Sequence, residues 1–356
     1  MSPMLRLDGK PIDGRLVPGH TWNADLIEFD GPLLSLFKSD EGDDVLYAWL
    51  DCSNSSNRWC IVPVSRDSLR DYLEQSLSLY DLFVRAPELI IFDVGLSARR
   101  HRFISTNWEK LPEAYLPDKT SYLTDEISTE AAKSFQREDT QSYFLGLDGE
   151  MYIDDLSAIP RTYQQLYSFH YGLEHLGRSA VQGTLSKLLK KWTGGFSAVN
   201  IFTGLRNVIP SIHRAQITEL RYNSPGHIEL NLLIELASKI EKAAEKIEQQ
   251  DDFAVSEEYY RTVYRFFREH NIGGFEDERK LSTQKLSPEV SADLNLFVER
   301  FFQIMGWADY RGNFDALDAN PLQQLRVLLA YYRRLRKLRP YIVQKKLLLG
   351  QSFLDA

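Results

Sequence analysis

Two short apolar runs separated by a polar loop form the first clear pattern along the chain. Residues 45–50 (VLYAWL) and 59–64 (WCIVPV) are rich in residue types that favour β-strands. Residues 51–58, between them, are rich in Ser and Asn, which suits a hairpin loop. The pattern predicts an antiparallel pair of strands, and the apolar run at 89–94 (LIIFDV) predicts a buried strand after them.

Helical spacing of apolar residues appears between these strands. Ser65 and Ser78 each precede such a segment, and a serine at this position accepts a hydrogen bond from the first turn of a helix. The second short helix is predicted over 79–85, because a proline follows it closely. Residues 100–106 mix Arg and His with apolar residues and are predicted to form an edge strand.

The expected fold class is therefore α+β, with a change of character along the chain. Residues 1–110 are predicted to form a small antiparallel sheet with short helices, and residues 111–160 a connecting region rich in polar residues and prolines. Residues 161–356 are predicted to be mainly helical, with a short strand near 217–222. The predicted helices lie within residues 163–192, 233–247, 257–270, 288–305 and 321–338.

Composition adds that the chain should fold, and that its charge is uneven. Of its 356 residues 43% are hydrophobic and 26% charged, as in ordinary globular proteins. The net charge of −8 argues against a surface coated with basic residues for nucleic acid. The segment 321–346, however, holds eight basic residues and no acidic one. These are Arg326, Arg333, Arg334, Arg336, Lys337, Arg339, Lys345 and Lys346.

Part of this basic segment has the pattern of an amphipathic helix. At about 100° per residue, apolar residues from Leu325 to Leu338 share one side. The opposite side carries the candidate binding residues, which are Arg326, Arg333, Arg334 and Lys337. Three interpretations stay open: a solvated charged face of a helix that is docked on the core, a surface for an acidic partner, and a phosphate-binding surface.

The search for catalytic chemistry yields no motif, and no catalytic residue, cofactor or metal site is predicted. Phosphate-binding loops, dinucleotide fingerprints, zinc motifs and nucleophile elbows are all missing from the sequence. Asp93 is the best single candidate for an unusual role, because it is a carboxylate within a strongly apolar strand. A structural role in capping a neighbouring backbone group competes with that interpretation.

The histidines give no metal site either. His170 and His175 are five residues apart, which places them about 140° apart on a helix rather than on one face. His213 and His227 flank the predicted strand at 217–222 and are read as solvated loop residues, with an approach across that strand as the alternative. We therefore favour a protein without a metal.

The sequence also predicts where the protein is found. No stretch approaches the ~20 consecutive apolar residues that a membrane helix requires. The first ten residues lack the pattern of a signal peptide. A cytoplasmic location without membrane contact is expected.

Several short motifs in the N-terminal third occur in an order that resembles an uncharacterised bacterial domain family. They are Gly31-Pro-Leu-Leu34, Tyr47-Ala-Trp49, Arg58-Trp59, Pro63-Val-Ser65, Leu69-Arg-Asp-Tyr-Leu73 and Leu79-Tyr-Asp-Leu82. The resemblance covers about residues 26–104 and implies no activity. Residues 220–226 (LRYNSPG) are similar to a stretch in bacterial proteins from conflict and defence gene neighbourhoods.

These features favour a non-catalytic interaction protein that acts with a partner protein, and the resemblances imply a bacterial defence or conflict system. The physical ground is the many aromatic residues and amphipathic helices, without a convergent polar cluster. Homodimerisation through segments 228–247 or 257–270 is a further expectation. Two alternatives are a metal-dependent nuclease or hydrolase with a dispersed site, and a nucleic-acid-binding protein that uses the basic segment 326–346.

Overall fold

The protein consists of two compact units. The computed structural model describes residues 4–95, 103–122, 140–192, 198–272, 286–317 and 319–353. Unit 1 comprises Met1–Asp139 together with Pro210–Ile212. Unit 2 comprises Thr140–Ile209 and His213–Ala356. Each unit has its own hydrophobic core.

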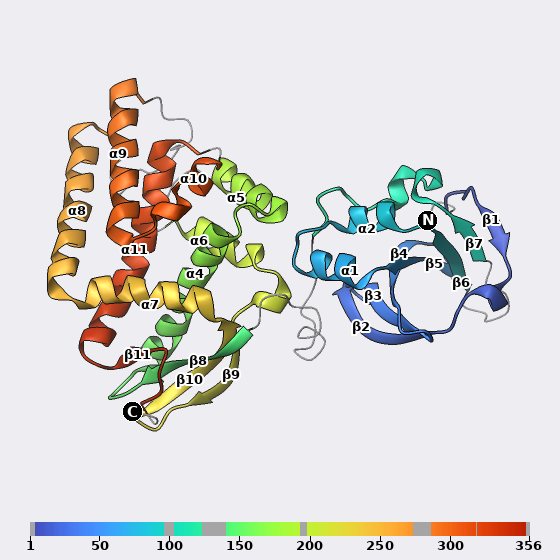
Figure 1. The fold of residues 1–356 in the computed structure, drawn as a ribbon, viewed down its shortest axis with the longest axis horizontal. Coiled ribbons are helices and arrows are strands. Elements are labelled where there is room, and N and C mark those ends of the chain that lie inside the picture. Colours follow the sequence, from blue (N-terminus) through green and yellow to red (C-terminus); the bar gives the residue numbers. More distant parts are fainter. Residues whose placement is uncertain are drawn as a thin grey trace. The chain divides into compact units, whose positions relative to one another are not determined.

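Unit 1 is built on a seven-stranded antiparallel sheet with two short helices (Figure 1). The strand order is β1-β7-β6-β5-β4-β3-β2, so that β2 to β7 follow one another as a meander and β1 adds to the far edge. The strands are β1 Lys10–Ile12, β2 His20–Glu28, β3 Pro32–Ser39, β4 Asp44–Cys52, β5 Ser56–Val64, β6 Leu89–Gly95 and β7 Phe103–Thr106. The helices are α1 Arg66–Leu73 and α2 Leu79–Arg85, with 3₁₀ turns η1 Gly14–Leu16, η2 Trp108–Lys110 and η3 Glu113–Tyr115.

The helix starts in unit 1 lie where the serines predict them. The Ser65 side chain accepts from the Ser68 amide, and Ser78 and Asp81 form a reciprocal capping box. The prediction of an antiparallel sheet with short helices is confirmed. The prediction that β7 is an edge strand is wrong, because β1 pairs with it through Lys10 opposite Ser105. Residues 100–102 of that prediction lie outside the described residues.

One face of the unit 1 sheet packs against α1 and α2. A row of small and aliphatic side chains crosses it in register, from Leu34 through Ala48 and Cys60 to Ile91. These four residues are at most 4% exposed. Aromatic and aliphatic side chains of the helices complete this core, notably Tyr72, Leu73 and Phe83.

Unit 2 combines a four-stranded sheet with a helical bundle (Figure 1). Its strands, in sheet order, are β11 Leu347–Leu349, β8 Thr140–Leu147, β10 Gly226–Leu233 and β9 Gln216–Arg221. Its helices are α4 Ile153–Glu174, α5 Ser179–Lys191, α6 Val199–Leu205, α7 Ile234–Glu248, α8 Gln250–Glu269, α9 Pro288–Met305, α10 Arg311–Asp315 and α11 Pro321–Val343. Its 3₁₀ turns are η4 Arg206–Val208 and η7 Ala308–Tyr310. A further turn, η5 Ser211–His213, is shared: its first two residues belong to unit 1 and His213 to unit 2. The described helices include none that is both long and apolar enough to cross a membrane.

The expected connecting region, 111–160, is divided between the two units. Leu111 and Tyr115 are buried in unit 1. From Thr140 onward the chain belongs to unit 2, where β8 pairs with both β10 and β11. The strand expected near 217–222 is β9. A second strand, β10, follows it and ends at Leu233, where the expected helix was to begin.

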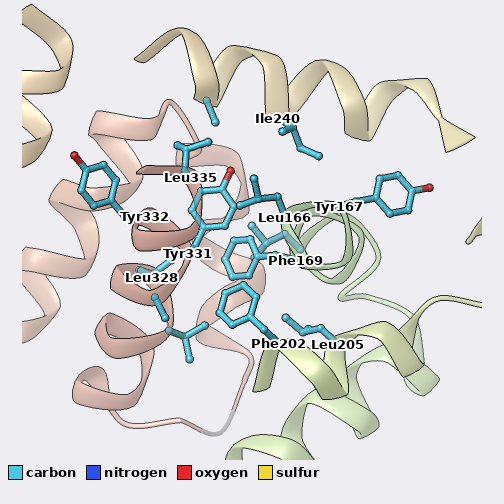
Figure 2. Close-up of a cluster of buried hydrophobic side chains, with 14 of the residues drawn as sticks. Leu166, Tyr167, Phe169, Phe202, Leu205, Ile240, Leu328, Tyr331, Tyr332 and Leu335 are labelled. Carbon is cyan, nitrogen blue, oxygen red and sulfur yellow. The ribbon is translucent and has the colours of Figure 1, made fainter. Parts of the chain in front are cut away.

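Helix α11 occupies the centre of unit 2. It packs against α4, α7 and α9, and sixteen of its residues are buried. Figure 2 shows Leu328, Tyr331 and Leu335 of α11 converging with side chains of the neighbouring helices. The partners labelled there are Leu166 and Phe169 of α4, Phe202 and Leu205 of α6, and Ile240 of α7. A helix buried on nearly all sides needs a partner for every polar group that it carries inward.

His170 is a polar group in this core, and its burial predicts acid sensitivity. Its Nε2 lies 2.8 Å from the Tyr331 hydroxyl oxygen. Its Nδ1 has no hydrogen-bond partner within the described residues. Burial, and next the charge of Lys239, lower the pKa of His170 from 6.5 to about 3. The native protein therefore holds this ring neutral, whereas the unfolded chain binds a proton below about pH 6.5.

The unit should consequently lose stability as the pH falls below 6.5, and the loss from this group continues down to about pH 3. Between pH 7 and pH 5 it amounts to about 2 kcal/mol. A His170→Gln variant should show a correspondingly flatter pH profile of denaturant unfolding, and the same change at exposed His270 should leave the profile unaltered. Equal profiles for the His170 variant and the original protein would refute the assignment.

Candidate functional site

Helix α11 carries the four predicted binding residues, but three of them are buried. The helix begins at a capping box between Asn320 and Gln323. Arg326, Arg333 and Arg334 are 1%, 8% and 6% exposed. Lys337 is exposed. The interpretation of a wholly solvated cationic face is therefore wrong: aromatic side chains of other helices cover it, and arginine packs well on such rings.

Arg326 has a structural role beneath this surface. Its guanidinium carbon lies 4.3 Å from the centre of the Phe267 ring. Its Nη2 donates to the carbonyl oxygen of Ile272 over 3.4 Å. It is not among the residues that line the pocket described below.

Arg333 and Arg334 are adjacent buried cations with different surroundings. Arg333 Nη1 donates to the hydroxyl oxygens of Tyr264 (2.6 Å) and Tyr260 (3.3 Å) of α8. Arg334 stacks on Phe202 of α6, with 3.6 Å between its guanidinium carbon and the ring centre. Its Nε donates to Gln165 Oε1 over 2.7 Å, and its Nη1 to a carbonyl oxygen of its own helix.

Among the residues that the structure describes, no carboxylate balances the charge of Arg334. Within the residues that the structure describes, its partners are an amide oxygen, a carbonyl oxygen and an aromatic ring. Burial, and next the charge of Arg333, lower the pKa of Arg334 from 12.5 to about 10. A buried cation normally has a counter-ion, and the described residues supply none for this guanidinium.

A pocket of about 750 Å³ opens beside these cations. Its basic lining residues are Arg161 of α4 and Arg333, Arg334, Arg336 and Lys337 of α11. The other lining residues are Asp154, Ser157, Ala158, Thr162, Gln165, Val199, Leu338 and Tyr341. Asp154 is thus the one acid among the lining residues. We call this site the basic pocket.

The cations of the basic pocket differ in how far they are already engaged. Arg336 forms an ion pair with Glu257 of α8, with 3.0 Å between Nη1 and Oε1. Arg161 and Lys337 are exposed at the pocket. A smaller hollow of about 170 Å³ shares Arg161 and adds Arg206. Basic residues therefore continue past the edge of the basic pocket.

The arrangement suits recognition of an anion. A guanidinium presents parallel N–H groups that match two oxygens of a phosphate or carboxylate. The pocket volume falls within the range of roughly 300–1,000 Å³ that is typical of small-molecule sites. The hydroxyls of Ser157 and Thr162 add neutral donors to the lining. The sequence predicted three of these lining residues, and it missed Arg161 and Arg336.

Asp93, the sequence candidate in unit 1, is engaged in an ion pair. Arg58 of β5 donates to both of its carboxylate oxygens, through Nε over 2.7 Å and Nη2 over 2.9 Å. Arg58 also donates to the hydroxyl oxygen of Tyr115, whose own proton goes to Asp51. The best candidate for a catalytic carboxylate thus has a structural partner.

The remaining histidine candidates are buried, contrary to their interpretation as loop residues. His213 is 0% and His227 7% exposed. His213 Nδ1 lies 3.2 Å from the Tyr171 hydroxyl oxygen, and Tyr171 stacks on His175. In the described ranges, no three His, Cys, Asp or Glu residues are grouped so that they could hold a metal ion.

Unit 1 has an aromatic surface that the sequence analysis did not single out. On the sheet face opposite the helices, the ring centres of Tyr47 (β4) and Phe92 (β6) lie 5.7 Å apart, although β5 separates their strands. Since neighbouring strands lie about 4.8 Å apart, these two side chains must lean toward one another across β5. Phe103 stacks on Phe92, and Phe37 packs on Tyr47. Alternation of aromatic residues within VLYAWL was the available signal.

Comparison with known proteins finds a family match in the N-terminal part of the chain. No curated protein and no solved structure matches the chain. The predicted resemblance to a domain of unknown function is confirmed, and the match extends beyond residue 104. Residues 26–142, which span most of unit 1 and reach the start of β8, match the model of a family of unknown function (DUF6575).

Proposed function

We propose that the protein is a non-catalytic binding protein, and that unit 2 recognises a phosphate-bearing ligand of about nucleotide size in the basic pocket. The observation that carries the proposal is the buried guanidinium of Arg334, which lies beside Arg333 without a carboxylate partner in the described structure. Such an arrangement costs folding free energy, and an anion that binds there returns part of it.

Geometry favours a compact ligand over an extended one. Arg334 lines a bounded pocket, which Arg161 and Lys337 line as exposed cations. An extended nucleic acid is usually held by a continuous basic groove with aromatic stacking platforms. Here the Phe202 ring is covered by Arg334. The nucleic-acid alternative therefore has less support than a small phosphorylated molecule.

The other expectations have no specific support from this site. Action beside a partner protein in a bacterial defence system stays a proposal that rests on the resemblances in the sequence. The alternative of a metal-dependent nuclease or hydrolase had Asp93 as its best candidate residue. Arg58 forms an ion pair with that carboxylate. We therefore argue anion recognition as the function of unit 2.

Titration calorimetry with pyrophosphate, ATP, a twelve-nucleotide single-stranded DNA and an acidic peptide tests the proposal. We expect pyrophosphate and ATP to bind, and pyrophosphate affinity to fall about tenfold between 50 and 200 mM salt because its charges are screened. Tighter binding of the DNA would favour the nucleic-acid alternative, and tighter binding of the peptide a protein partner. Absence of binding by all four at millimolar concentration would refute the proposal.

Charge reversal at the exposed cations of the pocket tests the site, and the same change at a distant lysine is the matched control. Arg161→Glu and Lys337→Glu place a negative charge at the pocket without disturbing a buried side chain. Each should weaken pyrophosphate binding about tenfold, in line with the loss of a nearby charge. Lys187→Glu, at an exposed position of α5 away from the pocket, should leave the affinity unchanged. Equal effects of all three variants would mean that only the net charge matters.

A further inference from the structure

Strand β9 lies at the edge of its sheet, and no further strand pairs with it on the outer side within the described part of the chain. The sheet order of unit 2 is β11-β8-β10-β9, so that β10 covers one side of β9. All six residues of β9, Gln216–Arg221, are exposed. A row of backbone N–H and C=O groups at such an edge is a template for another strand.

Two side chains of β9 are apolar although they are exposed. Ile217 is 52% and Leu220 58% exposed. The register between β9 and β10 shifts at Glu229 and Leu230, where Thr218 of β9 is the extra residue. Ile217 then lies opposite Leu230, and Leu220 opposite Ile228. Both apolar side chains therefore lie on the face whose β10 neighbours are buried, and a strand added at this edge would continue that face.

The charged residues of β9 at 219–221, where its pairing with β10 is regular, complement the same residues of a second copy. Glu219 and Arg221 flank Leu220, and their partners in β10 are Glu229 and His227. We propose that a second copy of the chain pairs with β9 in antiparallel register centred on Leu220. Glu219 of each copy then lies opposite Arg221 of the other, and the two Leu220 side chains meet at the two-fold axis.

This occupant fits better than the alternatives at the same edge. An in-register parallel copy would place Glu219 beside Glu219 and Arg221 beside Arg221, which like-charge repulsion disfavours. In the antiparallel dimer each Glu219 lies opposite an Arg221, so that the contact contains two pairs of opposite charge. Its two-fold symmetry limits the assembly to two copies, and no filament forms. It joins two four-stranded sheets into one continuous sheet. Segments 228–247 and 257–270 are a poorer dimer surface. Residues 228–233 belong to β10 and not to a helix, and most apolar side chains of both segments are buried in unit 2.

Sedimentation velocity from about 1 to 100 µM tests this pairing, since a single edge contact is small and predicts a dimer of micromolar affinity. The mass should rise with concentration from 41.2 kDa toward twice that value. Glu219→Arg alone and Arg221→Glu alone should each weaken the dimer at least about tenfold, because each sets like charges opposite one another. The double variant Glu219→Arg/Arg221→Glu should restore it.

Two further results decide between this edge and other surfaces. Leu296→Lys changes an exposed apolar residue of α9 and should leave the dimer intact. A chain that stays monomeric throughout, a double variant that is not restored, or a dimer lost on Leu296→Lys would each overturn the proposal. Since β9 contributes no residue to the basic pocket, these variants should leave anion binding unchanged. The two proposals are therefore tested independently.

Discussion

An Arg334→Met variant is expected to lose anion binding while unit 2 keeps its stability or gains some. Methionine retains an unbranched stem that packs on Phe202 and removes the buried charge. The lowering of the pKa of Arg334 from 12.5 to about 10 corresponds to a cost of about 3 kcal/mol for the charged form. Its hydrogen bonds to Gln165 and Ala330 and its stacking offset part of that cost.

The expected loss of pyrophosphate affinity is at least about thirtyfold, since removing one partner of a buried charge interaction costs 2 kcal/mol or more by a rough estimate. Titration calorimetry measures the affinity, and denaturant unfolding of the same samples measures the stability. A structural arginine would behave in the opposite way, with a large fall in stability and an unchanged pocket. A variant that is more than about 2 kcal/mol less stable would therefore contradict the binding role.

Arg339 of the same helix provides the matched control. It stacks on Phe253 at 3.9 Å from the ring centre and donates to the carbonyl oxygen of Ile247. It does not line the basic pocket. Arg339→Met should therefore lower stability modestly and leave pyrophosphate affinity unchanged. Together the two variants separate the loss of a ring-stacked arginine from the loss of a ligand contact.

The elements that sequence patterns predict best are those whose ends carry their own signals. Helix α9 spans Pro288–Met305, as predicted, because Ser287 caps its first turn and Gly306 adopts a left-handed conformation after its last. Helix α2 likewise begins at its serine cap. These signals are local, and the surrounding structure does not change them.

Interactions between distant segments explain what the sequence did not predict. The charged side of α11 was read as solvated, but Phe202 and Phe267 from other helices lie against its arginines. Periodicity shows which residues share a face of a helix and not what covers that face. Strand β10 was missed because a short apolar run suits a helix or a strand equally, and its partner β8 lies some 80 residues earlier.

The sequence predicted only part of the basic pocket, because the pocket is formed by two helices that are distant in the chain. Arg333, Arg334 and Lys337 were identified because they are close together on one predicted helix. Arg161 and Gln165 are four residues apart on α4, and this spacing places them on one side of that helix. Nothing local relates that side to α11, because the packing of α4 on α11 depends on their shared core.

Asp93→Ala is expected to destabilise unit 1 by about 3 kcal/mol, because it leaves the charge of Arg58 buried without its counter-ion. The Arg58 side chain is 9% exposed and that of Asp93 34%, so the loss should lie at the lower end for buried pairs. Hydrogen exchange of β5 and β6 amides reports on unit 1 alone. A loss of this size corresponds to exchange through unfolding that is about a hundredfold faster.

Two comparisons make the assignment of Asp93 to structure rather than to catalysis testable. Asp67→Ala removes a carboxylate that is itself 82% exposed, so that its ion pair with Arg70 contributes little and exchange should hardly change. Arg58→Met/Asp93→Leu removes both charges and should recover most of the lost protection, because no buried charge is then unpaired. If Asp93→Ala instead leaves β5 and β6 fully protected, the carboxylate does not stabilise the fold, and a direct role in chemistry at that strand becomes the better explanation.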